Sequence, residues 1–279
     1  MIDTARIEAD AAYQGTPGAF SEDAALALLG PEAILRPCRT LDDVFEVVAA
    51  RGARCAVVPV ENTLAGAVPG CDDLLRRHDV RIVGERVQHI AHALIAPPGT
   101  ALHDVRRVLS HPVALAQCRR FLDANPQMIA VPVFDTAGAV AEIIDRGESG
   151  GAAIASQRAA AVYGGVVLAS GIQDHPGNFT RFLVLEPGQV PETFYANRKT
   201  SLVCVLANQP GALARGIQAF AANGLNLSRI ESRPIPESPF EYTFYLDIDP
   251  APTADAVREA INELRACSRW LKILGHYPV

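Results

Sequence analysis

The sequence predicts an α/β protein with two α/β lobes, followed by a smaller domain of ferredoxin-like β-α-β-β-α-β order. Short apolar segments alternate with amphipathic helical segments up to about residue 186. The stretch from Pro187 to Lys199, which begins with Pro-Gly, has a second Pro and ends in Asn-Arg-Lys, is typical of a linker. We expect domains at residues 9–188 and 199–279. The first is divided into lobes at roughly 9–88 with 175–188, and at 89–174.

Composition and charge exclude several classes of protein. The chain has 279 residues, of which 49% are hydrophobic, and its net charge of −6 without a Lys/Arg cluster does not suit nucleic-acid binding. No apolar run approaches the roughly 18 residues that span a membrane. The N-terminal segment is acidic and lacks the apolar core of a signal peptide, so we expect a cytoplasmic location. The six cysteines form no C-x-x-C pair, and neither a metal nor a redox cofactor is expected.

The first lobe alternates strands and helices, which predicts a parallel-rich sheet with helices on both faces. We expect strands at residues 11–14, 34–37, 55–60 and 80–87, and helices at 18–29, 41–51 and 71–78. Ligands of such sheets lie at the carboxyl ends of the strands, beside helix N-termini. Polar clusters at these places are therefore candidate binding sites.

One such cluster is the turn at residues 14–21. Gly15 and Gly18 allow backbone N–H groups to approach a ligand closely, and Thr16 and Ser21 can donate hydrogen bonds or cap the helix. A plain turn between a strand and a helix has the same composition. The pattern alone leaves both interpretations open.

Another cluster, Glu61-Asn62-Thr63, directly follows the buried strand at 55–60. An acid, an amide and a hydroxyl in succession at the end of a buried strand are typical of a functional site or of a cap. The sequence does not decide between these two interpretations.

The second lobe continues the alternation. We expect a continuous strand at 88–95, further strands at 108–109, 128–133 and 152–155, and helices at 113–123, 136–146 and 156–163. His89 and His92 would point to opposite faces of the strand, so they are interpreted as two unrelated histidines and not as metal ligands.

A third polar cluster, Ser110-His111-Pro112, precedes the helix at 113–123. Ser110 can cap this helix and Pro112 suits its first turn, while Gln117 lies about one turn further along. His111 is equally compatible with an ordinary loop histidine.

The chain then returns in a strand at 173–186. The polar residues Asn178, Thr180 and Arg181 lie close together in this segment, at the point where a loop leads into the strand. Strand alternation places Asn178, Thr180 and Phe182 on one face and Phe179 and Arg181 on the other, although a bulge at the strand entry could turn Arg181 inward. An ordinary edge strand is the alternative that composition favours.

The C-terminal domain is expected to hold strands at 201–206, 225–232, 242–248 and 271–274 and helices at 211–222 and 253–266. This is the ferredoxin-like order. The turn at 208–213 leaves free N–H groups at the start of a helix, where a carboxylate could bind. Catalysis is not expected here, because the domain has no clustered acids and no Ser/His pair.

Together these segments resemble the prephenate dehydratase family with its C-terminal ACT regulatory domain, over residues 12–277. The most specific matches are the family's N-x-T-R-F, present as Asn178-Phe179-Thr180-Arg181-Phe182, and its E-S-R-P, present as Glu231-Ser232-Arg233-Pro234. Residues 58–63 with Gly66, residues 110–112 with Gln117, and residues 15–21 resemble the family's P-x-E-N-S, S-H-P…Q and G-P-x-G-T-F-S. The chain departs from these patterns at Thr16-Pro17, Ala19 and Thr63. The short segment before the first strand leaves no room for the chorismate mutase helices fused to some members.

The resemblance implies a two-lobed catalytic domain like that of periplasmic binding proteins. The implied reaction is decarboxylating dehydration of prephenate to phenylpyruvate on the phenylalanine pathway, with no metal or other cofactor. Catalytic roles are expected for Thr180, as hydrogen-bond donor to the leaving hydroxyl, and for Arg181, Asn178 and Glu61. Substrate-binding roles are expected for Gly15, Thr16, Ser21, Asn62, Thr63, Ser110, His111, Gln117 and Phe182. L-Phenylalanine, as effector of a homodimer or homotetramer, is expected at Gly211, Ala212, Leu213, Asn226, Leu227, Glu231 and Ser232.

Two alternatives stay open. Arogenate carries an amino acid side chain in place of the pyruvyl group of prephenate, and few protein side chains would separate the two substrates. Two lobes with an amino-acid-sensing domain could also form a non-catalytic binding protein. The absent export signal and the Thr180-Arg181 pair argue against that second alternative.

Overall fold

The computed structural model of the chain describes residues 8–235 and 238–279. The described residues form two compact units. One comprises the chain up to Val68 with Arg86–Phe182, and the other comprises Pro69–Glu85 with Leu183–Val279. Each of these units combines two separate segments of the chain, so they do not test the predicted domain boundaries at residues 9–188 and 199–279. Those boundaries stay a prediction.

The first lobe of unit 1 is built around three parallel strands in the order β2-β1-β3. Its elements are β1 (Ala9–Gln14), α1 (Phe20–Leu29), β2 (Leu35–Cys38), α2 (Leu41–Ala49), β3 (Ala53–Asn62) and β4 (Gly66–Ala67). Helix α2 begins where the sequence predicts, because Thr40 and Asp43 form a capping box. The carboxyl end of β3 brings Asn62 to the edge of this sheet.

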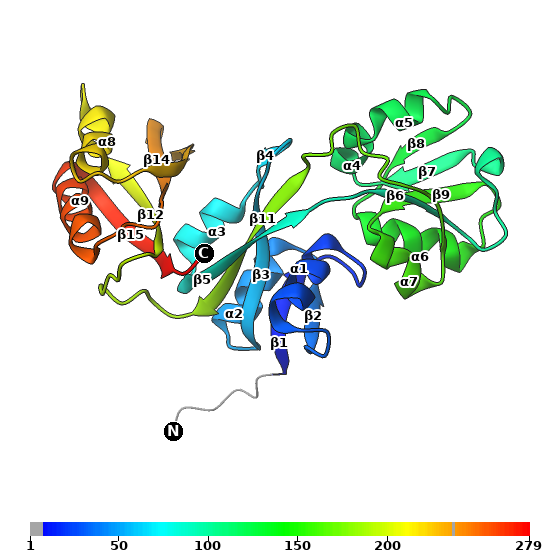
Figure 1. Cartoon of the computed structure of the whole chain (residues 1–279), viewed down its shortest axis with the longest axis horizontal. Coiled ribbons are helices and arrows are strands. Elements are labelled where there is room, and N and C mark those ends of the chain that lie inside the picture. The colour runs from blue at the N-terminus through cyan, green and yellow to red at the C-terminus, as the bar shows by residue number, and fades with distance from the viewer. Residues whose placement is uncertain (1–7, 236–237) are drawn as a thin grey trace. The chain divides into compact units, whose positions relative to one another are not determined.

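The second lobe of unit 1 holds a five-stranded sheet in the order β10-β6-β9-β7-β8. Its elements are β6 (Ala93–Ala96), a short 3-10 helix (Leu102–Asp104), β7 (Arg107–Ser110), α4 (Pro112–Gln117), α5 (Arg119–Asp123), β8 (Ile129–Pro132), α6 (Thr136–Arg146), β9 (Gly151–Ala155), α7 (Gln157–Tyr163) and β10 (Val166–Ser170). Helices α6 and α7 cover one face and α4 and α5 the other (Figure 1). The central strands β6 and β9 are therefore apolar and buried on both faces.

Two predictions for this lobe are wrong, and one strand was missed. The expected strand at 88–95 is interrupted between His89 and Ala93, where the backbone N–H of Ile90 donates to Asn178 O instead of to a strand neighbour. Strand β10 was not predicted. The expected helix at 113–123 is divided into two helices. Asp174 interrupts it, because its backbone N–H donates to the carbonyl of Gln117 and its carboxylate accepts from the N–H of Arg120.

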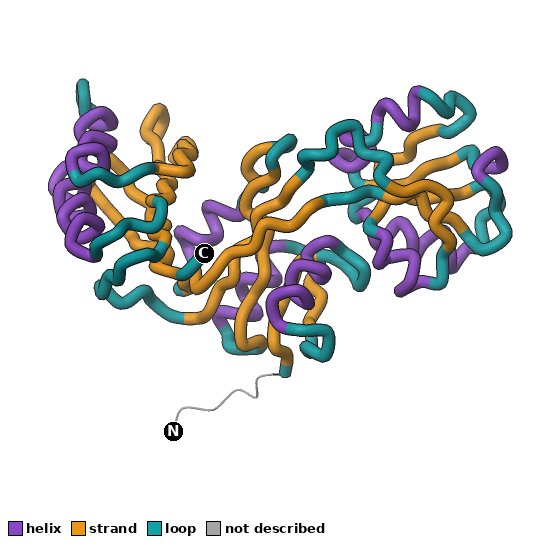
Figure 2. The backbone as a smooth tube through the Cα atoms, viewed as in Figure 1, coloured by secondary structure: helices purple, strands orange, loops and turns teal. Residues whose placement is uncertain are grey.

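Unit 2 contains the ferredoxin-like domain in the predicted β-α-β-β-α-β order. The domain consists of β12 (Lys199–Leu206), α8 (Ala212–Ala222), β13 (Leu227–Ile235), β14 (Ser238–Ile248), α9 (Ala254–Cys267) and β15 (Ser268–Tyr277). Its strands lie in the order β13-β14-β12-β15, with α8 and α9 packed on one face (Figure 2). Helix α3 (Cys71–Arg77) and parts of β5 (Val80–His89) and β11 (Phe179–Pro187) belong to the same unit, and β15 pairs with β5 at Gly275 and Ile82.

Two cations of the C-terminal domain hold helix α3. The guanidinium of Arg229 donates two hydrogen bonds to the Asp72 carboxylate, at 3.0 and 2.8 Å, and the two side chains are 8% and 0% exposed. The ammonium of Lys272 donates to the backbone carbonyls of Leu75, Arg76 and His78 at 2.8–3.2 Å, and burial lowers its pKa. These bonds satisfy carbonyl groups that the end of a helix otherwise leaves unpaired.

We predict that Asp72→Ala lowers the free energy of unfolding by about 3 kcal/mol, because it leaves the Arg229 guanidinium buried without its bidentate partner. Denaturant unfolding of wild type and variant measures this loss. Asp255→Ala is the control, since it removes a pair with Arg258 in which both side chains are more than half exposed. That change should cost at most about 0.5 kcal/mol. Equal losses in the two variants would contradict the prediction.

Candidate active site

The side chain of Asn62 is the centre of a polar cluster in unit 1. Its Nδ2 group donates to Asn178 Oδ1 at 2.8 Å, to Thr180 Oγ1 at 2.9 Å and to the backbone carbonyl of Phe179 at 3.0 Å. These residues come from the end of β3 and from the entry of β11. Burial alternates along this entry as the sequence predicts: Asn178, Thr180 and Phe182 are buried, whereas Phe179 is 38% exposed.

The orientation of the Asn62 carboxamide is set by the backbone. Its Oδ1 atom accepts hydrogen bonds from the N–H groups of Leu64 and Ala65, at 3.0 and 2.9 Å, as in an Asx turn. The NH2 group must therefore face Thr180, whose Oγ1 atom is the acceptor in this bond. The hydroxyl proton of Thr180 is not used in the bond and is left to donate elsewhere.

Gln117 brings a third carboxamide from the second lobe. Its Oε1 atom accepts from Asn178 Nδ2 at 3.0 Å, and its Nε2 atom donates to Asn62 Oδ1 at 3.4 Å. Together with the bond from Asn62 to Asn178, these contacts close a ring of three amides. The structure thus brings together four of the predicted site residues, which are Asn62, Gln117, Asn178 and Thr180.

Thr63 fastens the same two segments to each other. Its hydroxyl donates to the carbonyl of Gly177 at 2.8 Å and accepts from the N–H of Phe179 at 3.0 Å. Both hydrogen-bonding functions of this side chain are engaged within the protein, so its expected contact with substrate stays a prediction.

The two charged residues predicted for the site flank this cluster. Glu61 and Arg181 are half-buried, and each takes part in polar interactions. Arg181 follows Thr180 on the strand, so its side chain leaves from the opposite face. Their expected catalytic roles stay predictions.

The glycine turn that precedes α1 is occupied by contacts within the protein. Thr16 donates through its backbone N–H and its hydroxyl to one carboxylate oxygen of Asp135, at 3.2 and 2.9 Å. The N–H of Gly15 donates to the carbonyl of Cys38, and the N–H of Gly18 donates to Glu22 Oε2 at 2.7 Å. These N–H groups were expected to be open to a ligand, and in this structure they are not.

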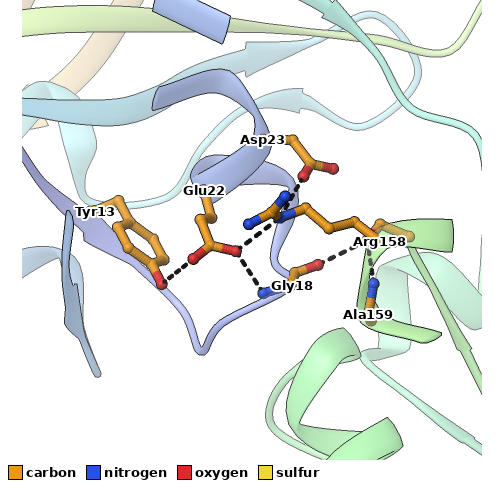
Figure 3. A network of polar contacts seen from close by, with 7 residues as sticks. Tyr13, Gly18, Glu22, Asp23, Arg158 and Ala159 are labelled. Carbon is orange, nitrogen blue, oxygen red and sulfur yellow. Dashed lines mark hydrogen bonds and ion pairs between the residues drawn. The ribbon is translucent and has the colours of Figure 1, made fainter. Parts of the chain in front are cut away.

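Glu22 is the residue that the sequence did not reveal. Figure 3 shows its carboxylate between Gly18, Tyr13 and Arg158, with hydrogen bonds of 3.3 Å from the Tyr13 hydroxyl and 3.1 Å from Arg158 Nε. Arg158 lies on α7 of the second lobe and also pairs with Asp23 at 3.3 Å. The two lobes of unit 1 are therefore joined by an ion pair between the largely buried Glu22 and the more exposed Arg158, as well as by the amide ring.

Ser110 and Ser21, which were expected to cap helices or bind a ligand, do not cap helices α4 and α1. Ser110 is fully buried and donates to the carbonyl of Ile154 on the neighbouring strand, at 2.6 Å. The cap of α4 is instead His111, whose Nδ1 atom accepts from the N–H of Val113. Ser21 is buried within α1, and the residue that caps this helix is Ala19, which has no side-chain bond. The prediction that Ser110 caps its helix is wrong.

The residues expected to bind an effector fall into two groups in a single chain. Ala212 and Leu213, next to Gly211 at the start of α8, line a cavity of about 140 Å3 together with Phe244. Ser232 lies opposite Phe244 in the sheet and therefore on the same face as this cavity, whereas Glu231 lies opposite Tyr245 and points to the other face. The second group, Asn226 and Leu227, lies at the other end of β13, roughly 16 Å away at 3.3 Å per residue.

Residues 8–235 and 238–279 contain neither a group of metal-ligating side chains nor a helix that could cross a membrane. Within these ranges no three His, Cys, Asp or Glu side chains are grouped as metal ligands. No helix in the same ranges is long and apolar enough to cross a membrane.

Known proteins match the chain along most of its length. The family model for prephenate dehydratase matches residues 11–189, and the model for the ACT domain matches residues 200–266. Arogenate dehydratase/prephenate dehydratase 2 of Arabidopsis thaliana is 41% identical over 282 residues, which cover 96% of this chain and 72% of the plant protein.

Two solved structures are similar to almost the whole chain at 35% sequence identity. One is prephenate dehydratase from Arthrobacter aurescens in complex with L-Phe, with a TM-score of 0.87 over 96% of this chain and 90% of that one. The other, described as the quorum-quenching acylase GqqA, has a TM-score of 0.86 over 96% of this chain and 97% of that one.

We predict that Asp23→Asn stabilises the protein at pH 7. The pKa of Asp23 is raised to about 6, chiefly because the group is buried; Arg158 lowers it and Glu22 raises it by smaller amounts. The folded state therefore binds this proton more tightly than the unfolded state, so the cost of ionising Asp23 grows as the pH rises from about 3.8 to about 6 and is fully present above that. A shift of about 2 pKa units corresponds to at most about 3 kcal/mol, since each unit is 1.36 kcal/mol.

Denaturant unfolding between pH 5 and 7 measures this effect. The advantage of Asp23→Asn over wild type should shrink as the pH falls from 7 to 5, because wild-type Asp23 becomes protonated in the folded state. Asp255→Asn, at an exposed position, should show no such trend. A constant difference between wild type and Asp23→Asn would contradict the assigned shift.

Proposed function

Because the chain belongs to the prephenate dehydratase family of lyases, we propose that the amide cluster around Thr180 removes carbon dioxide and water from prephenate to give phenylpyruvate. The observation that carries this proposal is the hydrogen bond from Asn62 Nδ2 to Thr180 Oγ1. In this bond the Thr180 oxygen accepts, so the hydroxyl proton of Thr180 is available to donate a hydrogen bond to a substrate.

The reaction needs little from a catalyst beyond positioning and proton handling. When the ring carboxylate leaves as carbon dioxide, the electron pair of the broken C–C bond enters the ring and expels hydroxide from the opposite carbon. Aromatisation supplies the driving force. The protein must stabilise the departing hydroxide and hold the pyruvyl carboxylate in place.

Thr180 is suited to the first task. A threonine hydroxyl is too weak an acid to release its proton outright, so it acts by donating a hydrogen bond to the departing oxygen. The bond that it accepts from Asn62 polarises the hydroxyl and strengthens it as a donor, because hydrogen bonds in a chain reinforce each other. Asn178 supports this arrangement through its bond to the same Asn62 nitrogen.

Neutral donors suit the carboxylate that leaves. An amide can hold a carboxylate without stabilising it as strongly as a cation does, so the barrier to decarboxylation stays low. Gln117 presents such a donor, since its Nε2 atom uses only one of its two protons in the bond to Asn62. The guanidinium of Arg181 would suit the carboxylate that stays with the product, and Glu61 would orient neighbouring groups.

The C-terminal domain gives the enzyme a regulatory site for L-phenylalanine. The support is the ACT-domain match and the similarity to a prephenate dehydratase solved with L-Phe. In one chain the two groups of expected effector residues lie at opposite ends of β13. A second copy of the chain would supply the missing group to each site, which favours a homodimer or homotetramer.

Arogenate is the second candidate substrate, since a plant relative is described as both an arogenate and a prephenate dehydratase. The cluster around Thr180 acts on the ring, which the two substrates share. Discrimination must then come from contacts to the pyruvyl or alanyl group. Turnover of each substrate, measured on the same preparation, ranks the two.

We predict that Thr180→Ala lowers kcat on prephenate by about a hundredfold or more, the size typical of a lost proton donor or charge-stabilising group. Ultraviolet detection of phenylpyruvate measures the rate, and circular dichroism confirms that the variant is folded. Thr180→Ser keeps the hydroxyl and should retain most of the activity. If the wild-type protein is inert on both prephenate and arogenate, the proposal is overturned. If that protein instead hydrolyses an acyl amide, an acylase activity is favoured.

We predict that L-phenylalanine lowers the activity and that Glu231→Ala and Asn226→Ala relieve this inhibition. The initial rate on the preferred substrate, measured at increasing phenylalanine concentration, tests both variants. Ser228→Ala is the matched control, because Ser228 is exposed on the same strand and was not assigned to the effector site. Unchanged sensitivity in both variants would contradict the placement of the site.

A further inference from the structure

His92 lies in the polar cluster but has no role in the function proposed above. Its side chain is 2% exposed, and its Nε2 atom lies 2.9 Å from Gln117 Oε1. The ring packs edge-on against Phe20, the first residue of α1, with 5.5 Å between ring centroids. Its backbone is fixed as well, because His92 N donates to Gln173 Oε1 and the N–H of Ile172 donates to His92 O.

The protonation state of this ring follows from the backbone in three steps. The N–H groups of Leu64 and Ala65 fix the oxygen of the Asn62 carboxamide. That oxygen accepts from Gln117, so the Gln117 nitrogen faces Asn62 and the Gln117 oxygen faces His92. An amide oxygen only accepts, and His92 must therefore carry a proton on Nε2.

The other ring nitrogen is then an unprotonated acceptor. Nδ1 of His92 is buried and has no hydrogen-bond partner in residues 8–235 and 238–279. A second proton there would be a buried donor without an acceptor, in addition to a buried charge. Burial accordingly lowers the pKa of His92, against a smaller opposing effect of the bond to Gln117.

We propose that neutral His92 is a positioning residue, which holds the Gln117 carboxamide with its NH2 group toward Asn62 and away from His92. This inference rests on the proposed function, because it concerns the same cluster and the same reaction. The Gln117 oxygen is held by two hydrogen bonds, from His92 and from Asn178 Nδ2. Without the Nε2–H donor, only the bond from Asn178 opposes a turn of this oxygen toward Asn62 Oδ1. Two amide oxygens would then face each other next to Thr180, and the donor geometry at the threonine would be lost.

The kinetic test compares two substitutions of His92. His92→Leu fills a similar volume without a donor and should lower kcat/KM by about tenfold, the effect of losing one buried hydrogen bond. His92→Gln places an amide nitrogen close to the position of Nε2 and should recover most of that loss. The rate is measured on prephenate or arogenate, whichever the wild type turns over, and thermal unfolding of each variant checks folding.

A double-mutant cycle separates positioning from general destabilisation. If His92 acts through Gln117, the variant with both His92→Leu and Gln117→Leu should be no slower than Gln117→Leu alone. Losses that multiply in the double variant would overturn the proposal, because His92 would then act independently of Gln117. Failure of His92→Gln to recover activity, in a protein that unfolds at the wild-type temperature, would also overturn it.

A spectroscopic measurement tests the same inference without any turnover. With the seven histidines labelled with nitrogen-15, the His92 signals are assigned by their absence in His92→Gln. At pH 7 we expect Nε2 to have the shift of a protonated ring nitrogen and Nδ1 that of an unprotonated one. The opposite tautomer, or a doubly protonated ring, would overturn the proposal. Inertness of the wild type on both substrates would instead remove the proposed function and leave this result standing.

Discussion

The orientation of one carboxamide determines the chemistry of the whole cluster. Two backbone N–H groups in the turn after β3 fix the oxygen of Asn62, and no rotation of the side chain can reverse this without placing its NH2 group against both donors. The direction of the Thr180 hydroxyl and the orientation of Gln117 follow from it. The turn at residues 62–65 therefore does more than connect two strands, because it sets which atoms of the site donate and which accept.

The sequence predicts those parts of the structure that depend on neighbouring residues. Helix α6 begins and ends as expected because Asp135 caps its first turn and Gly147 adopts a left-handed conformation at its end. The alternation of Asn178, Thr180 and Phe182 is likewise a property of a single strand. The ferredoxin-like order was readable because each of its helices carries its own apolar stripe.

The sequence does not predict features that depend on contacts between distant residues. Glu22 is separated by 136 residues from Arg158, and nothing near it in the chain indicates that it would take the N–H of Gly18. The break between α4 and α5 depends on Asp174, and the hydroxyl of Ser110 is directed to β9 and not to its own helix. These partners lie far away in the chain, so no local sequence pattern indicates them.

Lys272 has a consequence for the order in which the protein can fold during synthesis. The carbonyl groups at the end of α3 are satisfied by this lysine, which lies 197 residues after Leu75. Strand β5 likewise gains its neighbour β15 from the last ten residues before the C-terminal dipeptide. Helix α3 can form early on the ribosome, but the carbonyl groups at its end stay open to water until Lys272 has been translated and has left the ribosome. A nascent chain stalled before Lys272 should therefore be cut by protease next to α3, while a released full-length chain is protected there.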